Sequence, residues 1–175
     1  HGLMGRGGTG IAYETVQPEG CKLPMLTPMS EVAGRMATQI GATYLQKMYG
    51  GRGVLLGGVP GVASANVAIL GAGIVGTNAA RVAVGCGAQV TVLDTNPDSL
   101  KYLVDIYQGQ LQTRIRDEYN VEDVVLNADL RMCAILVPGG RATWLITPGV
   151  LPNMRKASVL VGDEVGCGGV GVWCW

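Results

Sequence analysis

Short apolar runs alternate with amphipathic segments along most of this chain. Runs rich in valine, isoleucine and leucine, four to nine residues long, predict buried strands, and apolar residues at helical spacing predict helices between them. Predicted strands fall at 66–70, 89–94, 111–115, 131–139 and 157–162, and predicted helices at 74–87, 97–107, 120–128 and 147–154. Strands and helices in this order predict an α/β fold, a doubly wound and mostly parallel sheet with helices on both faces.

The pattern before residue 66 predicts a strand at 10–17, a loop and a longer helix at 31–48. Three prolines disfavour a helix in the loop, namely Pro18, Pro24 and Pro28. Ser30 is a natural N-cap for the helix, and two glycines follow its end. Apolar residues recur every fourth position along it and predict a face packed into the core: Val32, Met36, Ile40, Tyr44 and Met48.

Composition narrows the classes of function. The 175 residues are 48% hydrophobic and 15% charged, which favours one packed domain or one lobe of a larger one. The formal net charge is zero and there is no lysine or arginine run, so neither nucleic acid nor a membrane surface is an expected partner. No apolar run approaches the roughly 20 residues of a membrane span, and no secretory signal is visible. We expect a cytoplasmic protein.

Cysteine and histidine usage restricts the chemistry further. The five cysteines lack C-x-x-C spacing, which favours reduced thiols and gives no reason to expect a metal site. The only histidine is His1, so an internal histidine base is unavailable unless the terminus folds back.

A glycine motif follows the predicted strand at 66–70. Gly71, Gly73 and Gly76 form G-x-G-x-x-G, a weak signal alone in a chain with 28 glycines. Here the motif opens a helix, and Asp94 ends the next strand 23 positions after Gly71. The glycines permit a tight turn, a close approach of pyrophosphate and close packing of helix on strand. A carboxylate at Asp94 suits the two ribose hydroxyls of NAD and would repel the 2′-phosphate of NADP. A tight turn without a ligand is the alternative.

Several stretches resemble bacterial alanine dehydrogenase: IAYETVQ, PMSEVAGRMA, GGRGVLLGGVPGV, ILGAGIVGTNAARVAVGCGAQVTVLDTNP, ADL and LVPGGRA. The related alpha subunit of proton-translocating nicotinamide nucleotide transhydrogenase matches the first and third of these less well. The resemblance implies a Rossmann-type NAD-binding domain. It further implies an enzyme that deaminates L-alanine to pyruvate and ammonia by hydride transfer, usually as a homohexamer.

The resemblance also implies roles for individual residues. Ser30 matches a serine whose hydroxyl meets a cofactor phosphate, a role compatible with N-capping. Asp94 matches the ribose-binding acid, and Ser99 stands where relatives often carry a basic residue. Core packing is an equal alternative for the strand end at 135–137. The implied cofactor-binding residues are Ser30, Gly71, Ala72, Gly73, Ile74, Val75, Gly76, Asp94, Ile135 and Leu136.

The chain departs from the family where catalysis is expected. An aspartate beside the substrate aligns with Gly166, and Asp163 and Glu164 stand three and two positions earlier. A slip in register would bring one of these carboxylates to the site, and two solvated acids at a strand end are the alternative. The family's substrate-binding arginine and lysine and its catalytic histidine precede the IAYETVQ strand, in segments that these 175 residues do not contain.

These observations suggest three parts and leave three hypotheses open. We expect a remnant of a substrate domain with a connecting loop at 1–29, an NAD-binding domain at 30–165 and an atypical tail at 166–175.

The first hypothesis for the function is that the chain is the NAD-binding core of an alanine dehydrogenase that acts on L-alanine and pyruvate. This core is incomplete for catalysis and belongs to a homo-oligomer. The second is a catalytically inactive NAD-binding module. The third is the NAD-binding component of a transhydrogenase.

Overall fold

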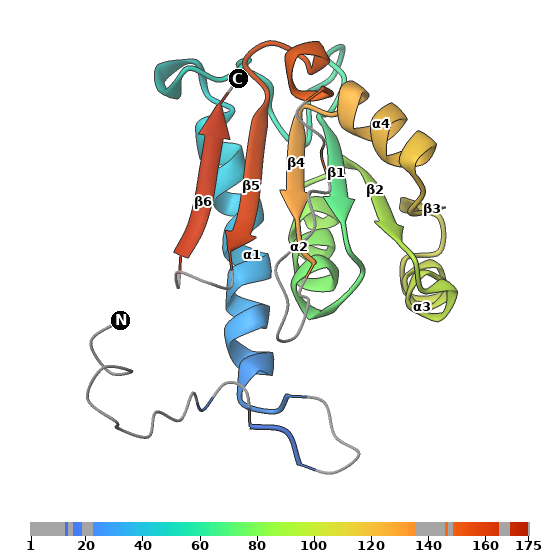
Figure 1. Cartoon of the computed structure of the whole chain (residues 1–175). Coiled ribbons are helices and arrows are strands. Elements are labelled where there is room, and N and C mark those ends of the chain that lie inside the picture. Colours follow the sequence, from blue (N-terminus) through green and yellow to red (C-terminus); the bar gives the residue numbers. More distant parts are fainter. Residues whose placement is uncertain are drawn as a thin grey trace, which may run out of the picture.

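A single six-stranded sheet organises the molecule. The computed structural model describes residues 13, 16–18, 23–135, 146, 149–164 and 169–174, with the side chains of 163–174 left out. The strands are β1 (Asn66–Leu70), β2 (Gln89–Asp94), β3 (Leu111–Ile115), β4 (Leu130–Cys133), β5 (Val159–Glu164) and β6 (Gly169–Cys174). Their order is β3-β2-β1-β4-β5-β6, in which β1 to β5 run parallel and β6 runs antiparallel to β5 (Figure 1).

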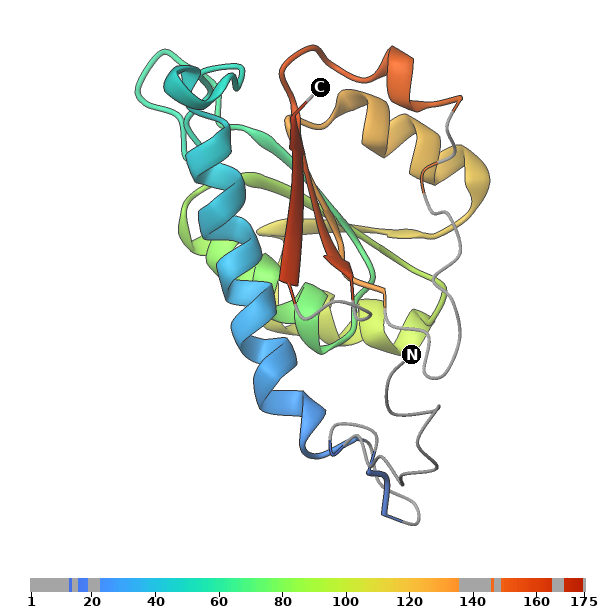
Figure 2. The same ribbon diagram turned by 60° about the vertical axis from the view of Figure 1, so that its left-hand side comes forward.

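Helices cover both faces of this sheet. They are α1 (Leu26–Tyr44), α2 (Ile74–Gly85), α3 (Pro97–Tyr107) and α4 (Glu118–Asn127), with short 3-10 helices η3 (Lys47–Tyr49) and η4 (Leu151–Asn153). Side chains alternate along β1, so Val67 and Ile69 pack in the core beneath α1, α2 and α3, while Ala68 and Leu70 pack beneath α4. Figure 2 shows α1 and α4 on opposite sides of the strands. The predicted doubly wound, mostly parallel α/β fold is confirmed.

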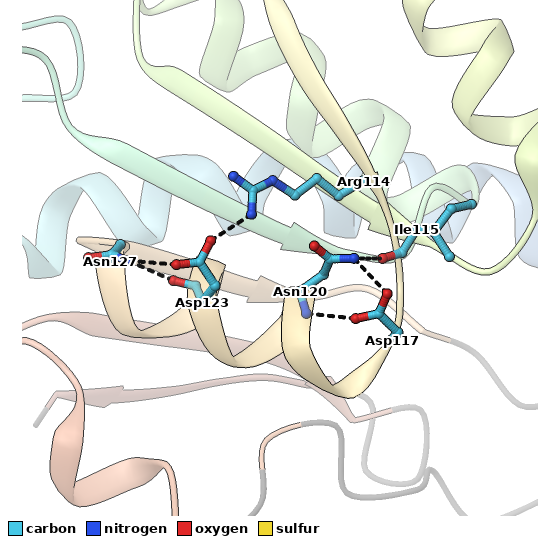
Figure 3. Close-up of polar contacts among 6 residues, drawn as sticks. All are labelled: Arg114, Ile115, Asp117, Asn120, Asp123 and Asn127. Carbon is cyan, nitrogen blue, oxygen red and sulfur yellow. Dashed lines mark hydrogen bonds and ion pairs between the residues drawn. The ribbon is translucent and has the colours of Figure 1, made fainter.

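Local signals locate the elements of the central region well. The bounds of β1, β2, α3 and β3 agree with the predicted ranges. Helix α3 begins where the Asn96 side chain accepts a hydrogen bond from the Asp98 N–H, with Pro97 at its first position. Helix α4 begins two residues earlier than predicted. Its N-cap is Asp117, which accepts from the Asn120 N–H at 2.7 Å (Figure 3).

The start and end of α1 differ from the prediction. The helix begins at Leu26, with Met25 at the N-cap position, so Ser30 lies inside the helix and does not cap it. Pro28 falls in the first turn, where the missing N–H and fixed φ of proline cost little, and it therefore does not exclude a helix. The helix ends at Tyr44.

The buried face of α1 is also different from the predicted one. The stripe predicted to enter the core points largely outward: Val32, Met36, Tyr44 and Met48 are exposed and Ile40 is half-buried. Small residues are buried instead, and these are Gly34, Ala37, Thr38 and Gly41. A Cβ on Gly34 would overlap the carbonyl oxygen of Val75, and one on Gly41 would lie 2.5 Å from a methyl of Leu130. Close approach to α2 and β4 selects small residues, and this requirement overrides apolar periodicity.

The remaining differences concern the two ends of the chain. Of the strand predicted at 10–17, only Tyr13, Val16 and Gln17 are described, and they are not in a strand. Strand β4 is shorter than predicted and η4 is a single turn within 147–154. Strand β6 pairs with β5 along its whole length, in the segment expected to be an atypical tail, and no strand was predicted there. No helix among the described residues is long and apolar enough to cross a bilayer.

Candidate functional site

The turn between β1 and α2 requires glycine at its first position. Gly71 has φ +112°, and a Cβ there would lie 2.5 Å from the carbonyl oxygen of Ala134. The Gly71 N–H donates to the carbonyl of Leu93 at 2.7 Å, which ties the start of the turn to the end of β2. The backbone thus turns sharply at the carboxyl end of β1, between the two neighbouring strands.

Gly73 and Gly76 are required for different reasons. A Cβ on Gly76 would overlap the carbonyl oxygen of Gly71, so only glycine allows α2 to pack this closely on the turn. Among the described residues, a Cβ on Gly73 would meet nothing within 4 Å, and the φ of Gly73 is −72°, which any residue adopts. Packing and backbone strain therefore do not explain glycine at this position. The space over Gly73 is open to an incoming group.

The first turn of α2 faces this open space. Gly73 is the N-cap residue and offers no side-chain acceptor to the N–H groups of the first turn. Such groups carry partial positive charge and bind phosphate oxygens well. The side chain of Thr77 donates to the carbonyl of Ala72 at 3.2 Å and steadies the turn.

Asp94 is joined directly to the glycine turn. Its Oδ2 accepts a hydrogen bond from the Ala72 N–H at 2.5 Å, and its Oδ1 accepts from the Asn96 N–H at 2.8 Å. The side chain is half-buried, and each carboxylate oxygen has a second lone pair to offer. The structure thus brings together Asp94 and the turn at 71–73.

Ser30 lies on the face of α1 that packs against α2. Gly34 faces Val75, and Thr38 donates to the carbonyl of Ala79 at 3.0 Å, so contacting residues are 41 positions apart in both pairs. The two helices therefore run in the same direction. One turn before Gly34, the half-buried Ser30 lies on the same helix face, toward the glycine turn.

The sequence analysis missed an interhelical contact beside the glycine turn. The buried side chain of Asn78 donates through Nδ2 to the carbonyl of Ile74 at 2.9 Å, and its Oδ1 accepts from Nε of Arg35 at 3.1 Å. Ile74 is the first residue of α2, so this pair links α1 to the start of that helix. The available signal was a polar asparagine within a helix made mostly of small and apolar residues.

The other predicted residues are placed only in part. Ile135 follows β4, is half-buried, and its Cγ1 would lie 3.0 Å from a Cβ on Gly71. Leu136 and Gly166 lie outside the described residues. Asp163 and Glu164 end β5, at the same edge of the sheet as the glycine turn, with side chains that are not described. Ile74 and Val75 form the first turn of α2 and are half-buried.

Cys133 ends β4 near the same edge. Burial raises the pKa of its thiol to about 11, so the group is a neutral thiol at neutral pH. The position suits a small packing residue and does not suit a nucleophile.

Comparison with known proteins agrees with this geometry. The family described as "Alanine dehydrogenase/PNT, C-terminal domain" matches residues 37–170. The chain belongs to this family. The alanine dehydrogenase of Bacillus subtilis (strain 168) is 52% identical over 168 residues, which are 96% of this chain and 44% of that protein.

Solved structures extend the comparison with the alanine dehydrogenase/PNT family. A structure titled L-alanine dehydrogenase matches with a TM-score of 0.85 and 48% identity over 91% of this chain and 44% of that one. A transhydrogenase from Sinorhizobium meliloti matches with a TM-score of 0.64 and 22% identity over 77% of this chain and 40% of that one, a likeness of fold alone. The chain thus spans somewhat less than half the length of these proteins.

Proposed function

We propose that this chain is the NAD-binding part of an alanine dehydrogenase, an enzyme that converts L-alanine with NAD to pyruvate and ammonia. The observation that carries the proposal is the Asp94 carboxylate, held by the Ala72 N–H beside a glycine turn whose central glycine faces open space. High identity to alanine dehydrogenases over nearly the whole chain supports the choice of enzyme.

The residues present fit a dinucleotide. The open position over Gly73 admits a pyrophosphate close to the backbone, where the N–H groups of Ile74 and Val75 begin the helix. In this proposal Ser30 donates its hydroxyl to a phosphate oxygen from the side of α1. The family resemblance assigns the adenosine and ribose to Ile135 and Leu136.

Asp94 gives the site its preference for NAD. The carboxylate keeps free lone pairs for two ribose hydroxyls after accepting from Ala72 and Asn96. A 2′-phosphate would place negative charge beside this carboxylate, which disfavours NADP. When bound, the cofactor accepts the hydride, and the role of this chain is to hold and orient it.

The end of β5 is the candidate location for the substrate chemistry in this proposal. Because β5 is parallel to β1, Asp163 and Glu164 come at the edge of the sheet that carries the glycine turn. They are the candidate carboxylates of this chain near the reacting atoms, with Gly166 at the position that the family resemblance assigns to an aspartate. We further infer a cytoplasmic homo-oligomer, consistent with the exposed methionine and valine side chains along α1.

Calorimetric titration of the purified chain with NAD tests the cofactor. We expect Asp94→Ala to weaken NAD binding by about tenfold or more, because two hydrogen bonds to a charged acceptor are lost, and to narrow the difference between NAD and NADP. Asp105→Ala, which removes an exposed acid on α3, is the matched control and should bind as the parent does. Equal NAD affinity in all three proteins would refute the assignment. Alanine-dependent NAD reduction by the full-length protein tests the reaction.

A further inference from the structure

A partly buried ion cluster lies at the edge of the sheet opposite the glycine turn. We call Arg52, Arg131, Arg155 and Asp129 the arginine cluster. Asp129 directly precedes β4, and its side chain is only 6% exposed. Its Oδ1 lies 3.1 Å from Nε of Arg52 and 3.2 Å from Nη1 of Arg155, and its Oδ2 accepts from the Asn66 N–H at 3.0 Å. One carboxylate oxygen therefore holds two guanidinium groups side by side.

Arg131 lies behind this pair. It is fully buried on β4, and its Nε donates to the carbonyl of Val125 in the last turn of α4 at 2.6 Å. Burial lowers the pKa of Arg131 to about 10, an effect that Asp129 opposes and that Arg155 and Arg52 increase. The group remains a cation at neutral pH. Its Nη1 and Nη2 are buried without a hydrogen-bond partner.

The cluster is short of negative charge and of acceptors. Three guanidinium groups share one carboxylate, which leaves a formal charge of +2. Within the described ranges, the buried side-chain atoms without a hydrogen-bond partner are Nη1 and Nη2 of Arg131, Oγ of Ser158 and Nε of Arg52, which lies 3.1 Å from Asp129 Oδ1 without the alignment of a hydrogen bond. Ser158 adjoins the cluster, because its N–H donates to the carbonyl of Arg155 and the next residue donates to the carbonyl of Asp129. No further carboxylate is paired with these guanidinium groups among the described residues, and the excess positive charge favours an anionic ligand.

We propose that the arginine cluster binds a phosphate group. The contact groups are the outer guanidinium edges of Arg52 and Arg155, whose side chains are 34% and 35% exposed. Arginine presents paired N–H donors in a fork that matches phosphate oxygens, and two forks held by one carboxylate are already oriented. Arg131 does not touch the ligand, because its terminal nitrogens are covered. Because Arg131 is buried, its positive charge is poorly screened by solvent and increases the electrostatic attraction of the site for phosphate.

Inorganic phosphate is the probe, titrated into the purified chain at constant ionic strength with chloride as the balancing anion. Binding is followed by the midpoint of thermal unfolding and by ³¹P line broadening. The test variant is the double substitution Arg52→Gln/Arg155→Gln. The control is Arg114→Gln, because Arg114 is similarly exposed at 38% but is paired one to one with Asp123 at 2.6 Å (Figure 3).

The parent chain and the Arg114→Gln variant should bind phosphate alike, and the double variant at least about tenfold more weakly, as the loss of charge-assisted hydrogen bonds implies. The glycine turn is unchanged in all three proteins, so phosphate bound there contributes equally and does not affect the comparison. A parent chain that responds no more to phosphate than to chloride would overturn the proposal, as would a double variant that binds as tightly as the parent. If the double variant fails to fold, Arg155→Lys, which keeps the charge but loses the fork, should still bind more weakly than the parent.

Discussion

The carboxyl and amino edges of the sheet carry two candidate anion sites that are built from different groups. At the carboxyl edge, the site consists of backbone: a glycine turn, the first turn of α2 and one carboxylate that accepts from the Ala72 N–H. At the amino edge, the arginine cluster consists of long side chains that come from three separate segments and meet at Asp129. The glycine turn requires positions without a side chain, because a Cβ would block the approach of a ligand or of the backbone. The arginine cluster requires its ion pairs, because Asp129 orients the guanidinium groups. Substitutions should therefore have different effects at the two edges.

The largest expected effect is at the amino edge. Asp129→Ala removes the only carboxylate of the arginine cluster and the acceptor for the Asn66 N–H, and it leaves Arg131 buried without its counter-charge. We expect the free energy of unfolding to fall by about 3 kcal/mol, a value typical of breaking a buried ion pair from one side. Urea denaturation measures it. A loss below about 1 kcal/mol, no larger than that of an exposed acid such as Asp105, would show that the cluster does not stabilise the fold.

At the carboxyl edge, we expect Gly76 to affect mainly the stability of the fold and Gly73 to affect mainly the binding of NAD. Gly76→Ala places a methyl on the carbonyl oxygen of Gly71, a backbone atom that cannot move alone, so we expect a loss of about 2–3 kcal/mol in the free energy of unfolding. Gly73→Ala meets open space and should cost less than about 1 kcal/mol. In the NAD proposal, it is Gly73→Ala that blocks the close approach of pyrophosphate. Chemical denaturation and NAD titration of both variants together check this, and a reversed order of the two effects would contradict it.

The contact between Arg35 and Asn78 should have a smaller effect. Asn78→Ala removes the hydrogen bond to the carbonyl of Ile74 and the acceptor for Arg35, and we expect a loss of about 1–2 kcal/mol in unfolding free energy. If the contact fixes the glycine turn, NAD affinity falls as well, while Asn127→Ala, which alters an exposed amide on α4, changes neither quantity by as much. Unchanged NAD affinity in a destabilised Asn78→Ala variant would limit the contact to a structural role.

The smallest effect concerns the reactivity of Cys133. Its raised pKa, about 11, means that the folded protein keeps the proton on this thiol at pH 8, and alkylation requires the thiolate. The exposed Cys86 should therefore react with iodoacetamide first, and Cys133 should react readily only as the pH approaches 11 or after unfolding. Peptide mass spectrometry of samples labelled at pH 8 and pH 10.5 follows both residues. Equal labelling at pH 8 would contradict the raised pKa of Cys133.

The same contrast explains what could be predicted from the sequence. The glycine turn and Asp94 lie within one strand-helix-strand unit, so their spacing along the chain fixes their contact in space. The bounds of β1, β2, α3 and β3 followed from apolar runs and helical spacing, and the structure adds the Asn96 cap at the start of α3. The arginine cluster was not predicted, because Arg52, Asp129 and Arg155 are far apart in the sequence and have no characteristic spacing.

Helix α1 shows where periodicity misleads. Its large apolar residues repeat every four positions and predicted a buried stripe, yet the buried face holds Gly34, Thr38 and Gly41 among its residues. The distance to α2 and β4 decides which face is buried, and a single sequence does not contain that distance. Strand β6 was missed for a related reason, because its glycine-rich sequence pairs with an edge strand that only the assembled sheet supplies.

Close packing of α1 on α2 also fixes the distance between the two edges. The 19 residues of α1 make a rod about 28 Å long, with Ser30 toward the glycine turn and the loop that carries Arg52 after its far end. No side chain cushions the contact at Gly34, so α1 cannot slide along α2 without a collision of backbone atoms. We therefore expect a shift of α2 along its axis to move α1 with it, and with α1 the loop that carries Arg52.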